Sequence, residues 1–206
     1  MTRHAVDARQ ALARLKEGNE RFVKNVRSIE SLATSAARAQ LVEGQQPFAI
    51  VLSCSDSRAP SELLFDAGLG ELFVVRVAGN IVAPSLVGSV EFAAATFGTE
   101  LVVVMGHTRC GAVKATIDAV TRGAQAPSDN VGDIVRRIEP SVRELAGIRD
   151  GDALMKAATR ANVRASVNHL RSGSRILEER IAAGRLLVVG AEYALETGQV
   201  DFFDVP

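Results

Sequence analysis

From residue 48 onward, short runs of apolar residues alternate with longer segments of helical periodicity. Apolar runs without interspersed polar residues are typical of strands that are covered on both faces in a parallel sheet. The alternation predicts helical crossovers between parallel strands. The expected strands are 48–53, 71–77, 101–106, 186–190 and 200–204, and the expected helices are 61–67, 84–97, 111–122, 131–146 and 153–183.

The two ends of the chain depart from this alternation. Residues 1–45 have apolar residues at helical spacing and predict an N-terminal helical arm, with a second helix at about 31–43. Residues 193–200 predict a hairpin with its turn at 196–198, so the last strand is expected to be antiparallel. A break at 172–174 divides the long helix. The expected fold class is α/β, with a mostly parallel central β-sheet, helical crossovers, an antiparallel C-terminal edge strand and an N-terminal helical arm.

Length and charge limit the classes of protein to consider. The chain has 206 residues, a length typical of one domain. We expect residues 1–206 to form a single domain, with an arm (1–45) and an α/β core (46–206). Lys and Arg number 24, as do Asp and Glu, so charge indicates neither nucleic acid nor a membrane as partner. No apolar run reaches transmembrane length, and the first residues lack the apolar core of a signal peptide. We therefore expect a cytoplasmic protein, in which cysteines are more typical of metal binding or catalysis than of a disulfide.

Both cysteines of the sequence lie directly after predicted strands. Cys54 follows the run 48–53, and Cys110 follows the run 101–106, with His107 three residues before it. The ends of strands are where sites are built in α/β proteins, and thiolates and imidazole are ligands of zinc. A structural zinc site would need a fourth ligand clustered with these three. The pattern therefore favours an open catalytic zinc site.

Asp56 and Arg58 stand two residues apart, just after Cys54. A guanidinium group can hold a carboxylate through two parallel hydrogen bonds, which keeps the carboxylate ionised and fixes its direction. Such a carboxylate can accept a hydrogen bond from a zinc-bound hydroxide and orient it toward a substrate. Taken alone, the pair would be interpreted as an incidental surface ion pair. Beside Cys54 we prefer the catalytic interpretation.

Segment 54–58, together with His107, Cys110 and Gly111, resembles the zinc signature of the β-class carbonic anhydrases. The resemblance implies a zinc lyase that reversibly hydrates CO₂ to bicarbonate and a proton, by attack of zinc-bound hydroxide on CO₂. It covers about residues 8–204 and includes segments 15–22, 70–80, 88–93 and 189–198. It implies Cys54, His107 and Cys110 as ligands of one Zn²⁺ per chain, and Asp56 and Arg58 as catalytic residues.

The resemblance also implies residues that bind the substrate, some of them contributed across a dimer interface. These are Gln45, Phe73, Ala78, Phe92 and Gly111. Ordinary core packing is an equal alternative for the two phenylalanines, and a solvated loop side chain is the alternative for Gln45. CO₂ and bicarbonate are the implied small-molecule partners, and self-association as a homodimer or a tetramer is implied as well.

The family also has a closed state, in which Asp56 releases Arg58 and becomes a fourth zinc ligand. Some bacterial members couple this state to bicarbonate held at a second site by a Trp, an Arg and a Tyr. Arg76 and Tyr193 match the last two, but Val51 stands at the Trp position and the sequence contains no Trp. This difference favours a resting state in which Asp56 and Arg58 are paired.

Three other functions stay open at this point. A related zinc hydrolase acting on CS₂ or COS would carry the same zinc motif, so only a comparison of substrates separates it. A zinc-dependent structural or regulatory module would not need the pair Asp56 and Arg58. A thiol redox protein is disfavoured because Cys54 and Cys110 do not form a Cys-x-x-Cys pair.

Overall fold

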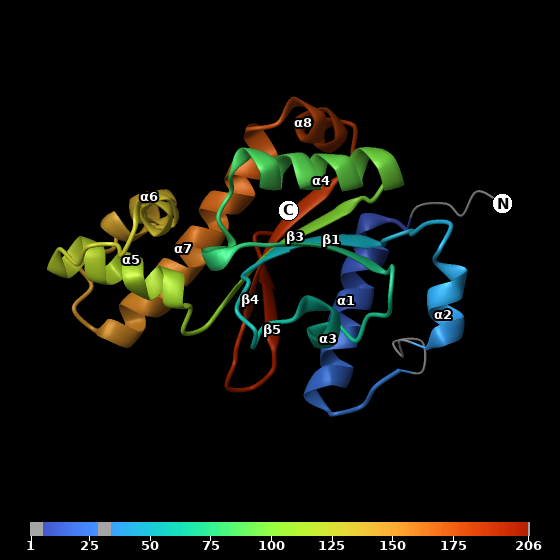
Figure 1. Ribbon diagram of the computed structural model, residues 1–206, viewed down its shortest axis with the longest axis horizontal. Helices are drawn as coiled ribbons and strands as arrows, with labels where there is room; N and C mark the ends of the chain where they lie inside the picture. Colours follow the sequence, from blue (N-terminus) through green and yellow to red (C-terminus); the bar gives the residue numbers. More distant parts are fainter. Residues whose placement is uncertain (1–5, 29–33, 206) are drawn as a thin grey trace.

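The computed structural model describes residues 6–28 and 34–205, and its centre is a five-stranded sheet (Figure 1). The strand order is β2-β1-β3-β4-β5. The strands are β1 (Ala49–Ser53), β2 (Leu72–Arg76), β3 (Leu101–His107), β4 (Leu187–Tyr193) and β5 (Val200–Phe203). The first four are paired in parallel, and β5 is antiparallel to β4. The predicted mostly parallel sheet with an antiparallel C-terminal edge strand is therefore confirmed.

Helices cover both faces of the sheet, because successive side chains of the central strands point to opposite faces and both sets are apolar. Val103 and Met105 of β3 belong to one buried cluster, whereas Val102 and Val104 belong to another. In Figure 1, the helices on one side of the sheet are α4 (Pro84–Phe97), α7 (Gly151–Ser172) and α8 (Arg175–Ala182), and those on the other are α1 (Ala8–Val23) and α3 (Ser61–Leu64).

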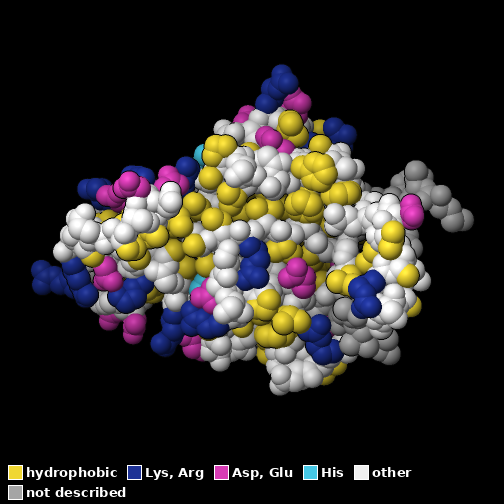
Figure 2. All heavy atoms as spheres, in the orientation of Figure 1, with side chains coloured by type: hydrophobic (Ala, Val, Ile, Leu, Met, Phe, Trp, Pro, Cys, Tyr) yellow, Lys and Arg dark blue, Asp and Glu magenta, His cyan; other side chains and the backbone are white. Residues whose placement is uncertain are grey.

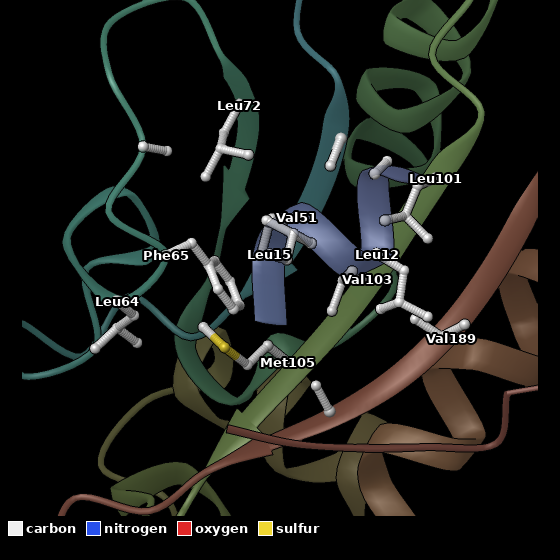
Figure 3. Close-up of a cluster of buried hydrophobic side chains, with 14 of the residues drawn as sticks. Leu12, Leu15, Val51, Leu64, Phe65, Leu72, Leu101, Val103, Met105 and Val189 are labelled. Atoms are coloured by element: carbon white, nitrogen blue, oxygen red, sulfur yellow. The ribbon is translucent and has the colours of Figure 1, made fainter. Parts of the chain in front are cut away.

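The cluster beneath α1 joins the N-terminal helix to the sheet (Figure 3). Leu15 of α1 is fully buried there together with Val51 of β1 and Met105 of β3, and Phe65 closes the cluster after α3. Burying a side chain of this size stabilises the fold by roughly 1.5–3 kcal/mol. The first helix of the predicted arm is thus part of the core of its own chain.

The predicted arm consists of two helices that are separated in the sequence. Helix α1 ends at Val23, and Asn25 then adopts a left-handed backbone conformation with φ 55°, which a continuing helix cannot accommodate. Helix α2 (Ser35–Gln40) is shorter than the predicted helix at 31–43, the first residues of which lie outside the described ranges.

The remaining helices follow the predicted pattern, with changes at their ends. Helix α5 (Gly111–Arg122) has the predicted bounds, and α6 (Asp129–Arg143) begins earlier because Ser128 caps it. The predicted break at 172–174 separates α7 from α8. Helix α3 is shorter than predicted, since the backbone turns at Asp66 with φ 46°. Among the helices of the described ranges, none has both the length and the apolar character needed to cross a membrane.

Helix α1 lies close to the end of α3 at Gly18. A Cβ atom on Gly18 would lie 1.9 Å from the carbonyl oxygen of Phe65 and 2.7 Å from its carbonyl carbon. Because backbone atoms cannot rotate aside as a side chain would, we expect Gly18→Ala to destabilise the fold by about 3 kcal/mol. The midpoint of urea unfolding, compared with wild type at one protein concentration, measures the effect.

Gly88 in α4 provides the matched control, because a Cβ atom there would meet nothing within 4 Å. Gly88→Ala should leave the midpoint unchanged or raise it slightly, as expected for alanine in a helix. A wild-type midpoint for Gly18→Ala would contradict the close approach of the two helices.

Candidate metal centre and active site

Two neighbouring strands bring three potential metal ligands to one edge of the sheet. Strands β1 and β3 are parallel, with Ser53 opposite Met105, so the segments that follow them meet at the same edge. Cys54 follows β1 directly, His107 is the last residue of β3, and Cys110 immediately precedes α5. Each of the three residues therefore lies at the end of a strand or at the start of a helix, which fixes its position.

The ligand atoms of Cys54, His107 and Cys110 all lie within 4.8 Å of one another. The three side chains are buried, with exposed fractions of 5%, 1% and 2%. Both cysteines are free thiols despite their proximity. Two sulfur ligands and an imidazole suit zinc, whereas magnesium and calcium prefer oxygen ligands.

The two nitrogens of His107 have different surroundings. Nδ1 lies 2.9 Å from the carbonyl oxygen of Thr108, which assigns the ring proton to Nδ1 as the donor of this bond. Nε2 is buried and has no hydrogen-bond partner among the described residues. A backbone carbonyl that orients the ring, and a buried lone pair directed at two thiols, are the features of a metal-binding histidine. The residues present therefore fit a zinc ion.

The thiols of Cys54 and Cys110 shift each other's pKa in opposite directions. The hydrogen bond from Cys110 lowers the pKa of Cys54 to about 4, and the amide of Gly79 contributes in the same direction. The same thiol–thiol bond, together with burial, raises the pKa of Cys110. The lowered pKa of Cys54 favours the thiolate, which is the form of cysteine that binds metal.

Asp56 and Arg58 form a bidentate pair beside this cluster. Arg58 Nε donates to Asp56 Oδ1 at 2.9 Å, Arg58 Nη2 donates to Oδ2 at 2.7 Å, and the Arg58 backbone N–H adds a bond of 2.9 Å. The bonds from Arg58 hold the pKa of the Asp56 carboxyl well below its usual range. Asp56 Oδ2 lies 3.8 Å from His107 Nε2, so an ionised carboxylate of fixed direction stands next to the three ligands.

Arg76 holds the backbone of the segment that carries Cys54 and Asp56. Its Nε donates to the Cys54 carbonyl oxygen at 3.1 Å, and its Nη2 donates to that of Asp56 at 2.8 Å. This role of Arg76 was not predicted from the sequence. The pairing of β2 with β1 indicates the role, because it places Arg76 opposite Ser53, the residue before Cys54.

The loop between His107 and Cys110 is held by the hairpin that joins β4 and β5. Glu196 accepts hydrogen bonds from Thr108 Oγ1 at 2.9 Å and from Arg109 Nε at 2.7 Å. Arg109 has a left-handed backbone with φ 56°, so this loop needs support from outside. This role of Glu196 was not predicted from the sequence. The pairing of β4 with β3 indicates this role, because it brings the end of β4, and the hairpin that follows, beside His107.

Loss of this support should weaken metal binding. We expect Glu196→Ala to raise the dissociation constant for zinc about 10-fold, at the lower end of the effect of outer-shell partners, because the loop loses two charge-assisted bonds. Competition with a chromophoric chelator measures this constant. Glu179→Ala is the control, because its exposed ion pair with Arg175 lies within α8. Equal zinc affinity of Glu196→Ala and wild type would show that the hairpin does not support the loop.

Two of the predicted substrate-binding residues lie at the cluster within the same chain. Ala78 begins the 3₁₀ turn η1 (Ala78–Asn80), which contacts Cys54, and Gly111 follows Cys110 as the first residue of α5. Their role in binding a substrate stays a prediction.

The other three lie elsewhere in the chain. Gln45 precedes β1, at the opposite end of that strand from Cys54. The ring of Phe73 contacts those of Phe92 and Phe97 from α4, with centroid distances of 6.2 and 6.0 Å. The role of Gln45, Phe73 and Phe92 at the site stays a prediction that depends on a second copy of the chain.

Fold and cluster together define a class of protein: an α/β protein with a site for one zinc ion, formed by two thiols and an imidazole beside a paired carboxylate. Residues 49–200 match the family model described as carbonic anhydrase. The chain belongs to the β-carbonic anhydrase family.

Individual relatives agree with this assignment over most of the chain. Carbonic anhydrase 2 of Mycobacterium tuberculosis is 42% identical over 185 residues, which cover 90% of this chain and 87% of the relative. The carbonic anhydrase of Mycolicibacterium smegmatis is 40% identical over 187 residues, which cover 91% and 89%. The solved structure of the β-carbonic anhydrase CcaA is 27% identical with a TM-score of 0.75, and the match covers 95% of this chain and 92% of that one.

Proposed function

We propose that this protein catalyses the reversible hydration of CO₂ to bicarbonate and a proton, with one zinc ion per chain held by Cys54, His107 and Cys110. One observation carries the proposal: the Asp56 carboxylate, fixed by Arg58, lies beside the three ligand atoms. A structural zinc site is closed by four protein ligands and has no use for an oriented carboxylate.

The chemistry is divided between the metal and the pair of charged residues. Zinc, when bound, supplies Lewis acidity and lowers the pKa of a water that it coordinates toward neutrality. Asp56 is ionised and can only accept hydrogen bonds, so it fixes the direction of an O–H group next to the ligands. Arg58 in turn keeps Asp56 from rotating through three hydrogen bonds.

The start of α5 supplies a site for the negatively charged product. The first amide groups of a helix have no partner within the helix and carry partial positive charge. Gly111 is the first residue of α5 and follows the proposed ligand Cys110, so its N–H can donate to an oxygen of bicarbonate. Ala78, in the turn on the other side of Cys54, forms the proposed apolar wall for CO₂.

Stopped-flow measurement of CO₂ hydration by protein of known zinc content tests the proposal. Near-stoichiometric zinc with hydration that persists from alkaline toward neutral pH supports it, including the paired state of Asp56 and Arg58. Activity confined to alkaline pH would indicate that Asp56 occupies the metal at rest. Turnover of CS₂ or COS without hydration of CO₂ would overturn the choice of substrate. Zinc without any turnover would favour a structural module, and protein without zinc would favour a thiol redox role.

We also propose that the chain associates with itself as a homodimer or a tetramer. Strand β2 is at an edge of the sheet, and Phe73 of this strand packs with the rings of Phe92 and Phe97. Phe92 is 54% exposed, and hydrophobic side chains gather over α4 (Figure 2). A second copy covering this edge would pair the free side of β2 and bury these rings. Sedimentation at a mass of 21.8 kDa, that of one chain, would contradict the proposal.

We further propose that residues 1–206 form one domain, with an arm (1–45) and a core (46–206). We also propose that the protein is located in the cytoplasm. The packing of α1 into the sheet supports a single domain, and the two free thiols suit a reducing compartment. Limited proteolysis that released a stable core without the arm would contradict the first proposal. Recovery of the protein outside the cytosolic fraction would contradict the second.

A further inference from the structure

A backbone amide is directed at one of the two thiols of the cluster. Gly79 N–H donates to Cys54 Sγ at 3.3 Å. A hydrogen bond to a metal-binding sulfur withdraws charge from it and fixes its lone pairs, so such bonds tune both affinity and electronic properties of the metal. Gly79 lies in the turn η1, and any group that fixes this turn therefore also fixes the bond to sulfur.

The turn η1 has a backbone that is not favourable by itself. Gly79 has φ 71° and Asn80 has φ 44°, so two successive residues are left-handed. Asn adopts this conformation more readily than other residues with a side chain, but it remains uncommon outside glycine. It persists only where the surrounding structure holds it. The space at Gly79 is also closed, since a Cβ atom there would lie 2.7 Å from Ile138 Cδ1.

Helix α7 supplies the groups that hold the turn. Asn162 Nδ2 donates to the Gly79 carbonyl oxygen at 2.8 Å, and Ser166 Oγ donates to the Asn80 carbonyl oxygen at 3.0 Å. The two side chains are four residues apart on one face of α7 and only 2% and 4% exposed. Because these bonds are buried, water cannot replace a missing donor without cost.

We propose that Asn162 is a positioning residue for the zinc site, which acts through Gly79 on the sulfur of Cys54. Asn162 binds the carbonyl of the residue whose N–H binds the sulfur. The two groups lie on either side of one Cα atom, so a bond that fixes the carbonyl limits how far the N–H can turn away from the sulfur. Ser166 supports the same turn one residue further on. The inference rests on the proposed role of Cys54 as a zinc ligand.

Asn162→Ala in the full-length protein tests the inference through the metal itself. We expect a zinc dissociation constant raised about 10- to 100-fold, as for other outer-shell partners. In protein loaded with Co²⁺, we also expect a shift of the sulfur-to-cobalt charge-transfer band, because that band reports on the charge of the thiolates. A merely structural role of Asn162 would lower stability without moving this band.

Thr159→Val is the matched control. Thr159 is equally buried on α7, but its hydroxyl donates to the Met155 carbonyl of the same helix and not to η1. The control should keep the wild-type cobalt spectrum. A spectrum of Asn162→Ala equal to that of wild type, or the same shift in Thr159→Val, would overturn the inference.

If Asn162→Ala does not fold, the cobalt spectrum of Ser166→Ala tests the inference instead. This variant removes a single hydroxyl and should shift the band in the same direction by a smaller amount, whereas an unchanged band would overturn the inference. The proposed function fails separately: wild-type protein that binds neither Zn²⁺ nor Co²⁺ would refute the zinc site itself. Wild-type protein that binds metal and hydrates CO₂, with unchanged variants, would refute only the role of Asn162.

Discussion

Replacement of Cys110 by serine is expected to remove zinc from the protein together with nearly all CO₂ hydration. A serine hydroxyl stays protonated near neutral pH and is a poor ligand for zinc, so only one sulfur and one imidazole would remain. The loss should exceed the roughly 10- to 100-fold effect that is typical of an outer-shell partner. Zinc content by mass spectrometry and hydration by stopped flow measure the two effects on one sample.

Thr121→Ser is a suitable control, because the Thr121 hydroxyl is exposed on α5 and bonds within that helix. It should have wild-type zinc content and activity. A Cys110→Ser protein that kept both zinc and activity would refute the assignment of Cys110 as a ligand.

Asp56→Asn should separate metal binding from turnover. The cluster of two thiols and an imidazole is unchanged, so zinc content should stay at the wild-type level. The neutral amide cannot form the charged bidentate pair with Arg58, and its NH₂ group donates where the carboxylate accepted. We expect kcat for CO₂ hydration to fall about 100-fold or more, in the range of catalytic proton-handling groups.

Asp118→Asn provides the comparison for a carboxylate outside the site. Asp118 forms ion pairs with Lys114 and Arg122 on the surface of α5, and its replacement should leave kcat unchanged. Hydration at the wild-type rate by Asp56→Asn would remove Asp56 from the mechanism.

The sheet and the ligand set were predictable because their signals are local in the sequence. A run such as 101–106 is apolar at every position but one, which is how a strand covered on both faces differs from an amphipathic one. The proximity of Cys54 and His107 then follows from the rule that neighbouring parallel strands end at the same edge of a sheet. The bounds of α2 and α3 were less predictable, since single left-handed residues and capping bonds decide where short helices end.

The residues that hold the site were not predictable in this way. Asn162 and Gly79 are 83 positions apart, and Thr108 and Glu196 are 88 apart. A buried asparagine inside a helical pattern gives no indication of which carbonyl it binds until the helix has been placed on the sheet. The predicted role of Phe73 in the substrate pocket depends on association of two chains. A second copy of the chain is needed to bring this residue to a zinc-binding cluster.

The three metal-binding side chains come from the ends of two strands that are adjacent only when the centre of the sheet has formed. An unfolded chain cannot present them together, so zinc binds the native state in preference. By mass action, each tenfold increase in free zinc above the dissociation constant adds about 1.4 kcal/mol to the free energy of unfolding. We therefore expect removal of zinc to lower the stability of the fold as well as the activity.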